Sequence, residues 1–472
     1  MNKKSKIHFE VSERKILLRI FDVVFVLLAL FFVGKILYLE YLLEASTSKF
    51  EDSTRELSSM LLLGLYINVI GTIFEMYNLQ VASNQYKVLK SSILTASGTV
   101  LLYLLTPVFS PTLPTTRFQI LIFYFTVFFA ILFWRIFYVK FLASNRFAQN
   151  VILICDREQV EELIVGLENS DPHYKIVVFV ESEKDSDTSF DYHFVQSIKT
   201  TDLVSFVNVN NIFEIVVAVQ NAADIKIELY QQLLQLLENG TTIREYSQVY
   251  EDKNLRIPVQ HIDRDFYKFF PFNRSNNNKV YLLNAKILDI VFSIIGILIG
   301  IFLLPFILFG NAIGNNGKLF YTQERVGKNG AVFRIFKFRT MVNNAEKEGA
   351  VFSTPNDYRI TPFGKFMRKT RIDEIPQFIN ILKGDMAIIG PRPERPFFVK
   401  EIAAIMPFYE TRHVIKPGLT GWAQVNYSYG ESVEDSLIKL QYDLYYIKHR
   451  SIFLDINITI KTISTVLFYR GQ

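Results

Sequence analysis

The sequence has few of the residues that build covalent cross-links and zinc sites. Its single cysteine, Cys155, excludes a disulfide within the chain. The six histidines are scattered without an HExxH pattern, and no CxxC pair is present, which argues against a zinc site. Any bound metal ion should therefore have oxygen ligands. The formal net charge of +5 is small for 472 residues, so the overall charge gives only weak support to an anionic partner, and we expect no nucleic acid.

Apolar residues are abundant. They make up half of the chain and include 43 phenylalanines. Four apolar stretches of about 17 to 25 residues fill the first third, and each is long enough to cross a hydrocarbon core of about 30 Å. They cover residues 16–39, 57–73, 92–109 and 118–142. The first is too long for a cleavable signal peptide and is not followed by a small-residue cleavage site, so it should remain as an anchor. The sequence therefore predicts a multi-pass membrane protein with four transmembrane helices over residues 1–145.

Basic residues near these stretches predict their orientation. They precede the first stretch, lie between the second and third, and follow the fourth, whereas the loop 107–117 has three prolines and one positive charge. Because cytoplasmic loops are enriched in lysine and arginine, both ends of the bundle should face the cytoplasm. Two carboxylates, Asp22 and Glu75, lie inside or at the edge of apolar stretches. An intramembrane carboxylate suggests function, but their positions near span ends favour an interfacial structural role.

The residue pattern changes after Asn150, where short β-branched runs alternate with polar helical segments. The runs are VILIC at 151–155, KIVVFV at 175–180 and FEIVVAV at 213–219. They predict a Rossmann-like parallel sheet with a doubly wound order over residues 146–272. The turn after the first strand, CDREQV, contains no glycine, although a dinucleotide pyrophosphate needs glycines there for close backbone approach. The domain is therefore expected to be regulatory or structural, with Cys155 as a small buried apolar residue.

A polar linker, 273–278, leads into a C-terminal domain, 273–472, which begins with another apolar run. This run covers 287–309 and is interrupted only by Asp289 and by Pro305 near its far end. Lysines and arginines flank both ends, so both flanks look cytoplasmic. Since a proline inside a helix removes a hydrogen bond and kinks the helix, we expect a re-entrant membrane helix over about residues 285–310, kinked at Pro305. The alternative, a plain transmembrane helix, would place the remaining chain outside.

Charged residues and glycines cluster from residue 321 to residue 421. The segments are TQERVGKNG, FRIFKFRTM, YRITPFGKFMRKTRIDEIPQFINILKGDMAIIGPRPERP and KPGLTGWAQV. In their order they closely resemble the catalytic domain of the bacterial polyprenyl-phosphate hexose-1-phosphate transferases, over residues 279–472. The four spans and the sheet domain also resemble the long form of this family, though less specifically. The expected fold class is a membrane α-helical bundle plus α/β, with a C-terminal α/β catalytic domain.

The segment TRIDEIPQFINIL has apolar residues at i, i+3, i+4 and i+7 from Ile375, which predicts a helix with Asp373 on its polar side at the start. Aspartate is a favoured N-cap and Pro376 is tolerated in a first turn, so a helix cap is the structural alternative for Asp373. Adjacent Asp373 and Glu374 would point about 100° apart on a helix. One carboxylate could then face a reacting phosphorus while the other holds a cation.

The resemblance implies a reaction. Asp373 would be the catalytic nucleophile that attacks the sugar-linked phosphorus of a UDP-sugar and releases UMP, and Glu374 would help to bind Mg²⁺. Undecaprenyl (polyprenyl) phosphate would then attack the aspartyl phosphosugar in a ping-pong sequence. This step would initiate exopolysaccharide, capsule or O-antigen synthesis, with the catalytic domain on the cytoplasmic face of the bacterial inner membrane. The sequence leaves open which sugar is transferred and whether the chain forms a homodimer.

Attack by a carboxylate on a phosphate anion needs cations, and the same region is rich in them. By resemblance, Arg368 and Arg392 would contact phosphate, where a planar guanidinium can bind two oxygens at once. Lys337 and Arg339 would share one face of a strand and could reach the nucleotide or stabilise the fold. Lys416, in KPGLTG, could approach phosphate together with the backbone, and a structural turn is the alternative.

Other residues have two interpretations. Arg371 could contact phosphate or lipid headgroups. Asp443 and Asp455 resemble acidic positions of the family, and solvated or salt-bridged carboxylates are the alternative. The aromatic and basic residues at 442–450 and 468–470 could lie in the membrane interface or form ordinary packed helices.

Two other functions fit parts of the sequence. A membrane-bound nucleotide-sugar dehydratase or epimerase also joins four spans to a doubly wound domain, but the missing glycines after VILIC count against it. A non-catalytic scaffold of polysaccharide assembly is the second alternative, although the motif residues show no sign of decay. Membrane lipids are expected partners in each case.

Overall fold

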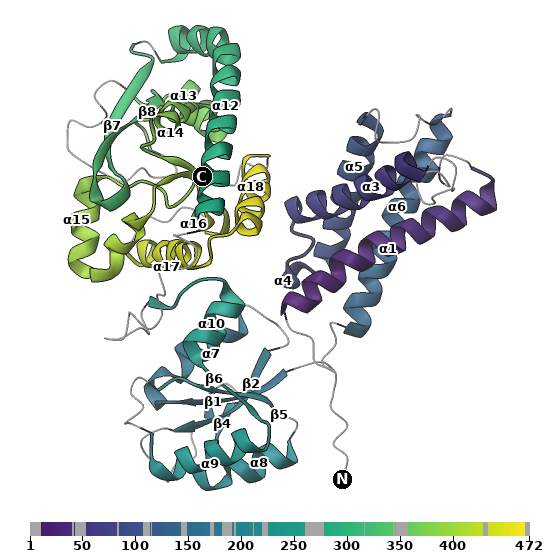
Figure 1. Cartoon of the computed structure of the whole chain (residues 1–472), viewed down its shortest axis with the longest axis vertical. Coiled ribbons are helices and arrows are strands. Elements are labelled where there is room, and N and C mark those ends of the chain that lie inside the picture. The colour runs from purple at the N-terminus through teal and green to yellow at the C-terminus, as the bar shows by residue number, and fades with distance from the viewer. Residues whose placement is uncertain are drawn as a thin grey trace. The chain divides into compact units, whose positions relative to one another are not determined.

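The structure is a computed structural model. It describes residues 11–39, 42, 53–82, 85–106, 114, 116–142, 149–169, 174–181, 191–192, 195–210, 212–219, 225–259, 278–315, 317–342, 345, 357–427 and 433–467. The chain divides into two compact units, Met1–Asn254 and Leu255–Gln472. The first unit contains a helical bundle and a sheet domain, and the second contains a long apolar helix with an α/β domain (Figure 1).

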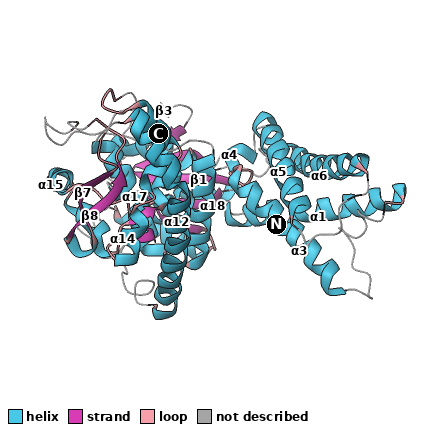
Figure 2. Cartoon of the chain, turned by 90° about the horizontal axis from the view of Figure 1, so that it is seen from above, coloured by secondary structure: helices cyan, strands magenta, loops and turns pink. Residues whose placement is uncertain are grey.

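Helices form over all four predicted N-terminal stretches. The elements are α1 (Val11–Leu37), α3 (Ser53–Ile73), α4 (Leu79–Ala82), α5 (Gln85–Leu105), α6 (Arg117–Phe137) and a π-helical turn (Tyr138–Leu142). Three segments are long and apolar enough to cross a membrane, whereas the apolar part of α3, Ser58–Ile73, is shorter. These three are Glu13–Leu37, Tyr86–Leu105 and Arg117–Phe141. In Figure 2 the described residues of this region are helices and connecting loops.

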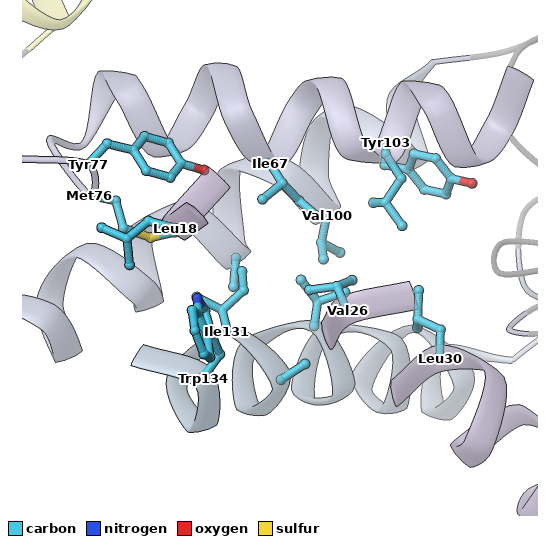
Figure 3. Packing of buried hydrophobic residues seen from close by; sticks show 14 of the residues in the cluster. Leu18, Val26, Leu30, Ile67, Met76, Tyr77, Val100, Tyr103, Ile131 and Trp134 are labelled. Atoms are coloured by element: carbon cyan, nitrogen blue, oxygen red, sulfur yellow. The ribbon is translucent and has the colours of Figure 1, made fainter. Parts of the chain in front are cut away.

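The inner faces of these helices form one apolar core. Figure 3 shows Val26, Ile67, Val100 and Ile131, from four different helices, meeting in this core. The outer faces also carry large apolar side chains, and Phe118 is 70% exposed. Water disfavours such a surface, whereas hydrocarbon accommodates it. The bundle therefore has the surface of a membrane protein.

An ion pair lies fully buried inside the bundle. Arg135 of α6 donates to both carboxylate oxygens of Asp22 on α1, from Nε to Oδ1 at 3.0 Å and from Nη2 to Oδ2 at 2.5 Å. Its Nη1 donates to the carbonyl of Met76 at 2.9 Å. Both charged side chains are 0% exposed. Their charges and hydrogen bonds are matched to one another, so the structural role predicted for Asp22 is favoured, while Glu75 lies exposed in a turn after α3.

The sheet domain contains six strands among its described residues, in the order β3-β4-β2-β1-β5-β6. Neighbouring strands are parallel except β3 with β4. The strands are β1 (Gln149–Cys155), β2 (Tyr174–Glu181), β3 (Asp191–Tyr192), β4 (Val195–Ser197), β5 (Ile212–Val217) and β6 (Thr242–Glu245). The helices are α7 (Val160–Glu168), α8 (Leu203–Val209), α9 (Ile227–Glu238) and α10 (Tyr246–Asn254), with 3₁₀ turns at Arg157–Gln159 and Thr200–Asp202. The predicted parallel sheet is confirmed.

Helices cover both faces of this sheet (Figure 1). Because side chains alternate along a strand, Val151 and Leu153 of β1 pack in the core with α7 and α10, while Ile152 and Ile154 pack with α8 and α9. Cys155 ends β1 and is fully buried, as expected for a small apolar residue.

The second unit combines helices with two small sheets. Its elements are α12 (Lys279–Gly314), β7 (Phe320–Val326), a 3₁₀ turn (Lys328–Gly330), β8 (Val332–Phe338), α13 (Pro362–Lys369), a 3₁₀ turn (Ile372–Glu374), α14 (Gln377–Lys383), β9 (Ala387–Ile389), α15 (Pro396–Ile405), a 3₁₀ segment (Pro407–Val414), β10 (Gly418–Thr420), α16 (Trp422–Asn426), α17 (Val433–His449) and α18 (Ile452–Leu467). Strands β7 and β8 form an antiparallel hairpin, and β9 pairs with β10 in parallel.

The chain enters this second unit at Leu255. The indole nitrogen of Trp422 donates to the carbonyl of Leu255 at 2.9 Å, and the amide of Ile257 donates to the carbonyl of Gln441 at 3.1 Å. The segment therefore packs on α16 and α17. Of the predicted linker, residues 273–277 lie outside the described residues.

Helix α12 covers the predicted re-entrant segment. It is a single assigned helix of 36 residues with Pro305 inside it, and it is long and apolar enough to cross a membrane. Figure 1 shows α12 changing direction near its C-terminal end, which is the expected effect of an internal proline. Large side chains such as Phe302, at 73% exposed, point away from the domain.

Glycines on α12 let α14 and the nearby Ile375 approach closely. A β-carbon at Gly296 would overlap the ring of Phe378 on α14, and one at Gly300 would come within 2.7 Å of the side chain of Ile375. Ile375 directly follows the acidic pair. The apolar membrane helix thus forms the support on which the acidic turn and α14 rest.

Candidate active site

The acidic pair lies in the 3₁₀ turn Ile372–Glu374, between α13 and α14, and not in the first turn of a regular α-helix. Arg371, just before it, has φ 59°, in the left-handed region that few non-glycine residues adopt. Asp373 and Glu374 are 7% and 6% exposed. The turn that follows Arg371 therefore holds two adjacent carboxylates, and both are buried.

Glu374 is surrounded by cations. Its Oε1 lies 2.9 Å from Nη2 of Arg392, 3.3 Å from Nζ of Lys337 and 3.5 Å from Nη1 of Arg371. Burial opposes ionisation of Glu374, but the three surrounding cations outweigh burial and hold its pKa below the usual range. Burial lowers the pKa of Lys337, and Glu374 acts against that shift. The cluster therefore has more positive than negative charge around one carboxylate.

Asp373 has a different environment. Its Oδ1 is buried and has no hydrogen-bond partner among the described residues, and neither neighbouring helix uses it as a cap. Burial raises the pKa of Asp373 to about 6, and the adjacent charge of Glu374 acts in the same direction. With a pKa of about 6, the side chain is mostly a carboxylate near neutral pH. The helix-cap interpretation of Asp373 is not supported by these contacts.

Asn380 ties α14 to β8. It is fully buried, its Oδ1 accepts from the amide of Phe336 at 3.0 Å, and its Nδ2 donates to the carbonyl of Arg334 at 2.8 Å. Lys337 directly follows Phe336 and reaches Glu374. The predicted polar face of α14 therefore faces β8. Through Asn380 it fixes the strand that carries Lys337 relative to the turn that carries Glu374.

Side chains of other elements hold the backbone around Arg392. Its carbonyl accepts from Nη2 of Arg412 at 3.0 Å, and the same nitrogen lies 2.7 Å from Oδ2 of Asp443. Arg325 donates from Nη1 to the carbonyl of Pro393 at 3.0 Å. Burial raises the pKa of Asp443 to about 6, although Arg412 acts in the opposite direction. Asp443 is thus a salt-bridged carboxylate that secures the loop around Arg392, a role that its sequence context left open.

Arg368 lies on α13, and its positive charge acts on Asp373. Its Nε donates to Oγ1 of Thr340 at 2.9 Å. Gly364 allows this arrangement, because a β-carbon there would overlap the backbone of Thr340. The resemblance did not identify Thr340 as a site residue, although it lies within the FRTM motif.

Two predicted substrate contacts lie apart from this cluster. Arg339 donates to the carbonyls of Lys318, Met341 and Asn315 at 2.7, 2.9 and 3.0 Å. These contacts favour the fold-stabilising alternative for Arg339. Lys416 is exposed, and its Nζ lies 3.5 Å from the position of a β-carbon on Gly384, at the end of α14.

Residues 442–449 of the segment 442–450 lie in α17, and Tyr446 is only 1% exposed, which favours an ordinary packed helix. Asp455 on α18 accepts from the hydroxyls of Tyr281 and Tyr446 at 2.8 and 2.9 Å. It therefore ties the start of α12 to α17 and α18. Residues 468–470 lie outside the described residues.

The site fits a magnesium ion with few protein ligands. The described residues contain no group of three or more His, Cys, Asp or Glu side chains placed to hold a metal. Glu374, the expected magnesium ligand, is a buried carboxylate beside Oδ1 of Asp373, a buried oxygen without a hydrogen-bond partner among the described residues. Magnesium commonly takes one or two carboxylates and completes its shell with phosphates and water.

Comparisons with known proteins identify the second unit. The family model described as bacterial sugar transferase matches residues 280–469. A UDP-N-acetylgalactosamine-undecaprenyl-phosphate N-acetylgalactosaminephosphotransferase of Aeromonas hydrophila is 50% identical over 151 residues, which are 32% of this chain and 36% of that protein. A UDP-glucose:undecaprenyl-phosphate glucose-1-phosphate transferase of Xanthomonas campestris pv. campestris is 42% identical over 161 residues, which are 34% of this chain and 33% of that protein.

A third relative is covered over most of its length. This Bacillus subtilis (strain 168) protein, provisionally named an undecaprenyl-phosphate N-acetylgalactosaminyl 1-phosphate transferase, is 40% identical over 153 residues, which are 32% of this chain and 86% of that protein. The match thus spans about a third of the length of the first two relatives and nearly all of the third. Taken together with the motifs, these matches show that the chain belongs to the bacterial sugar transferase family, that of the polyprenyl-phosphate hexose-1-phosphate transferases.

Proposed function

We propose that this chain is a phosphoglycosyl transferase that moves a sugar 1-phosphate from a UDP-sugar to undecaprenyl phosphate, releases UMP and initiates the synthesis of a surface polysaccharide. One observation carries the proposal: a buried carboxylate oxygen of Asp373, without a hydrogen-bond partner in the part of the chain that the structure describes, lies beside a carboxylate in contact with three cations. The printed names of two relatives, which contain a UDP-sugar donor and undecaprenyl phosphate, support the choice of substrates.

In the first step a carboxylate oxygen of Asp373 attacks the sugar-linked phosphorus. A new bond forms between this oxygen and phosphorus, the bond from phosphorus to the bridging oxygen of UDP breaks, and UMP leaves with that oxygen. Arg392 and Lys337 are placed at Glu374 where they can also meet the negative charge of the phosphates.

In the second step an oxygen of undecaprenyl phosphate attacks the same phosphorus. The bond to Asp373 breaks, the carboxylate is regenerated, and the product is the lipid diphosphosugar. Mg²⁺ held by Glu374 would neutralise phosphate charge. Because Asp373 carries the phosphosugar between the two half-reactions, donor and acceptor can use the site in turn.

The lipid acceptor requires a site at the membrane surface. We infer that α12 enters the cytoplasmic leaflet and turns back at its bend near Pro305, so that the second unit stays at the cytoplasmic face of the inner membrane. The apolar side chains exposed along α12 support a membrane-embedded course. Labelling of single cysteines introduced at exposed positions of the second unit tests this arrangement, and labelling from the periplasm alone would refute it.

A donor-only assay tests the covalent mechanism. Purified full-length protein with Mg²⁺ and a panel of UDP-sugars, but no lipid, should release about one UMP per enzyme with the correct sugar and then stop. Addition of undecaprenyl phosphate should restart turnover. A protein that releases no UMP before the lipid is added would contradict the two-step mechanism.

The sheet domain fits a structural or regulatory role. The turn after β1 contains no glycine, and a 3₁₀ turn precedes α7. A stoichiometric NAD in the purified protein would instead favour a dehydratase or epimerase. Binding of assembly partners without any UMP release would favour a scaffold.

A further inference from the structure

Asp289 is the acidic residue within the apolar run 287–309 of α12, and the steps proposed above do not use it. A carboxylate on a membrane helix is costly without a partner and commonly has a function. Here the amide of Ile388 donates to Oδ1 of Asp289 at 2.7 Å. Lys416, Arg450 and Asp455 lie close enough for their charges to act on this carboxylate.

The contact completes the hydrogen bonding of β9. This strand pairs with β10 along one edge, with Ala387 opposite Gly418 and Ile389 opposite Thr420. Because backbone groups of successive residues point to opposite edges of a strand, the amide of Ile388 points away from β10. Asp289 therefore supplies the acceptor on the other edge, and loss of this acceptor would leave the amide unpaired at the surface of α12.

Strand β9 leads directly into the loop that carries Arg392, four residues beyond Ile388. Other contacts hold the same loop from the side of β10: the amide of Gly390 donates to the carbonyl of Thr420 at 2.9 Å, and the amide of Gly418 donates to the carbonyl of Pro391 at 2.8 Å. The hydrogen bond from the amide of Ile388 to Asp289 holds β9 from the side of α12.

The same side of α12 supports both halves of the site. Asp289, Gly296 and Gly300 follow each other at seven and four residues, a spacing that places them on one helix face. Gly300 meets Ile375, next to the acidic pair, and Asp289 meets Ile388, next to the Arg392 loop. Helix α12 therefore contacts both the segment next to Glu374 and the strand that leads to Arg392.

We propose that Asp289 is a positioning residue: its carboxylate fixes β9 against α12 so that the guanidinium of Arg392 reaches Glu374 and the phosphates of the donor. This inference rests on the proposed transferase function. It concerns the placement of Arg392 and assigns Asp289 no contact with substrate.

Two variants of similar volume test it. Asp289→Asn keeps an oxygen acceptor, whereas Asp289→Leu removes it and suits an apolar helix. We expect kcat for UMP release by full-length protein to fall about 10- to 100-fold in Asp289→Leu, with donor KM within about threefold of wild type. Asp289→Asn should retain kcat within about threefold. Ser293→Ala is the control, because it removes a polar atom of the same helix that has no hydrogen-bond partner among the described residues.

Hydrogen exchange gives a readout that does not depend on activity. The backbone amides of residues 386–393 should exchange faster in Asp289→Leu than in wild type, Asp289→Asn or Ser293→Ala. Unchanged kcat and exchange in Asp289→Leu would overturn the proposal, as would equal damage in the Asn and Leu variants. If Asp289→Leu does not fold, Asp289→Ala, which also removes the acceptor, replaces it, and wild-type kcat and exchange there would also overturn the proposal. Wild-type protein inactive with every UDP-sugar would refute the transferase function, and the exchange comparison would still test the contact.

Discussion

Two buried charge clusters of this protein differ in how their charges are paired. In the membrane bundle, Asp22 faces one guanidinium, and Arg135 satisfies both of its oxygens in a pair that is 0% exposed. In the second unit, a single oxygen of Glu374 faces three cations, and the adjacent Asp373 has an oxygen without a partner among the described residues. The first cluster pairs one anion with one cation, whereas the second places three cations around one carboxylate.

The difference in charge pairing indicates a structural role for the first cluster and a chemical role for the second. A matched ion pair in an apolar interior specifies how two helices pack and offers nothing to a ligand. A carboxylate with an excess of cations can share them with an anionic substrate, and an unpartnered carboxylate beside it can form a bond. Substitutions in the two clusters should therefore have different consequences.

The largest effect is expected at Asp373. Asp373→Asn keeps the shape of the side chain but removes the nucleophile, so kcat for UMP release should fall at least about 10³-fold with little change in thermal stability. Labelled donor should no longer attach to the protein. Glu410→Gln is the control, since it makes the same carboxylate-to-amide change at an exposed position. Near-normal turnover in folded Asp373→Asn would exclude the covalent mechanism.

In the bundle, Arg135→Ala should lower the free energy of unfolding of the bundle by about 3–5 kcal/mol, because it leaves Asp22 buried without its partner. The midpoint of thermal unfolding in detergent measures this effect. Replacing both partners together, with Asp22→Leu and Arg135→Met, should recover most of the stability. A loss of kcat without a loss of stability would instead indicate a function for this pair.

Arg392→Lys should lower kcat/KM about 10- to 100-fold, since lysine keeps the charge but not the planar fork that can bind two phosphate oxygens. The matched change Arg339→Lys should mainly lower the melting temperature, because Arg339 donates to three backbone carbonyls. If Arg339→Lys instead lowers kcat/KM and Arg392→Lys lowers only the melting temperature, Arg339 and not Arg392 would contact the substrate.

The smallest predicted effect is a pH dependence. Burial raises the pKa of Asp373 to about 6, and the reactive form is the carboxylate. Protonation below that pH removes the nucleophile, so kcat/KM should decline toward acid by about tenfold per pH unit. Lys337 lowers the pKa of Asp373, so Lys337→Met should move the midpoint of this decline to higher pH. A flat profile from pH 5 to pH 8 would contradict this assignment.

Local patterns predicted much of the fold. The apolar stretches became helices, and the runs around VILIC became strands of a parallel sheet, because both depend on residues close together in the sequence. The prediction that a helix starts at Asp373 was wrong. A left-handed Arg371 places the acidic pair in a separate 3₁₀ turn, and residue spacing does not reveal this backbone reversal.

The candidate site was predicted in part. Lys337 and Arg392, predicted as substrate contacts, both lie at Glu374, a contact that the sequence did not predict. Arg371, for which headgroup contact was an alternative, also lies there. Arg339, two residues from Lys337, instead bonds to carbonyls around the end of α12. The two side chains diverge because β8 ends at Phe338, before the alternation of a strand can continue.

By itself, the sequence determined the apolar helices, the parallel sheet, the family and the identity of the acidic pair, because periodicity and motifs are properties of neighbouring residues. The surroundings of Glu374, the absence of a partner for Oδ1 of Asp373 among the described residues, and the contact of Asp289 with the amide of Ile388 emerged only in the folded chain. Apart from Arg371, three residues from Glu374, these contacts join residues that are 18 to 99 positions apart. Their distances follow from the packing of whole helices and strands, which no local pattern encodes.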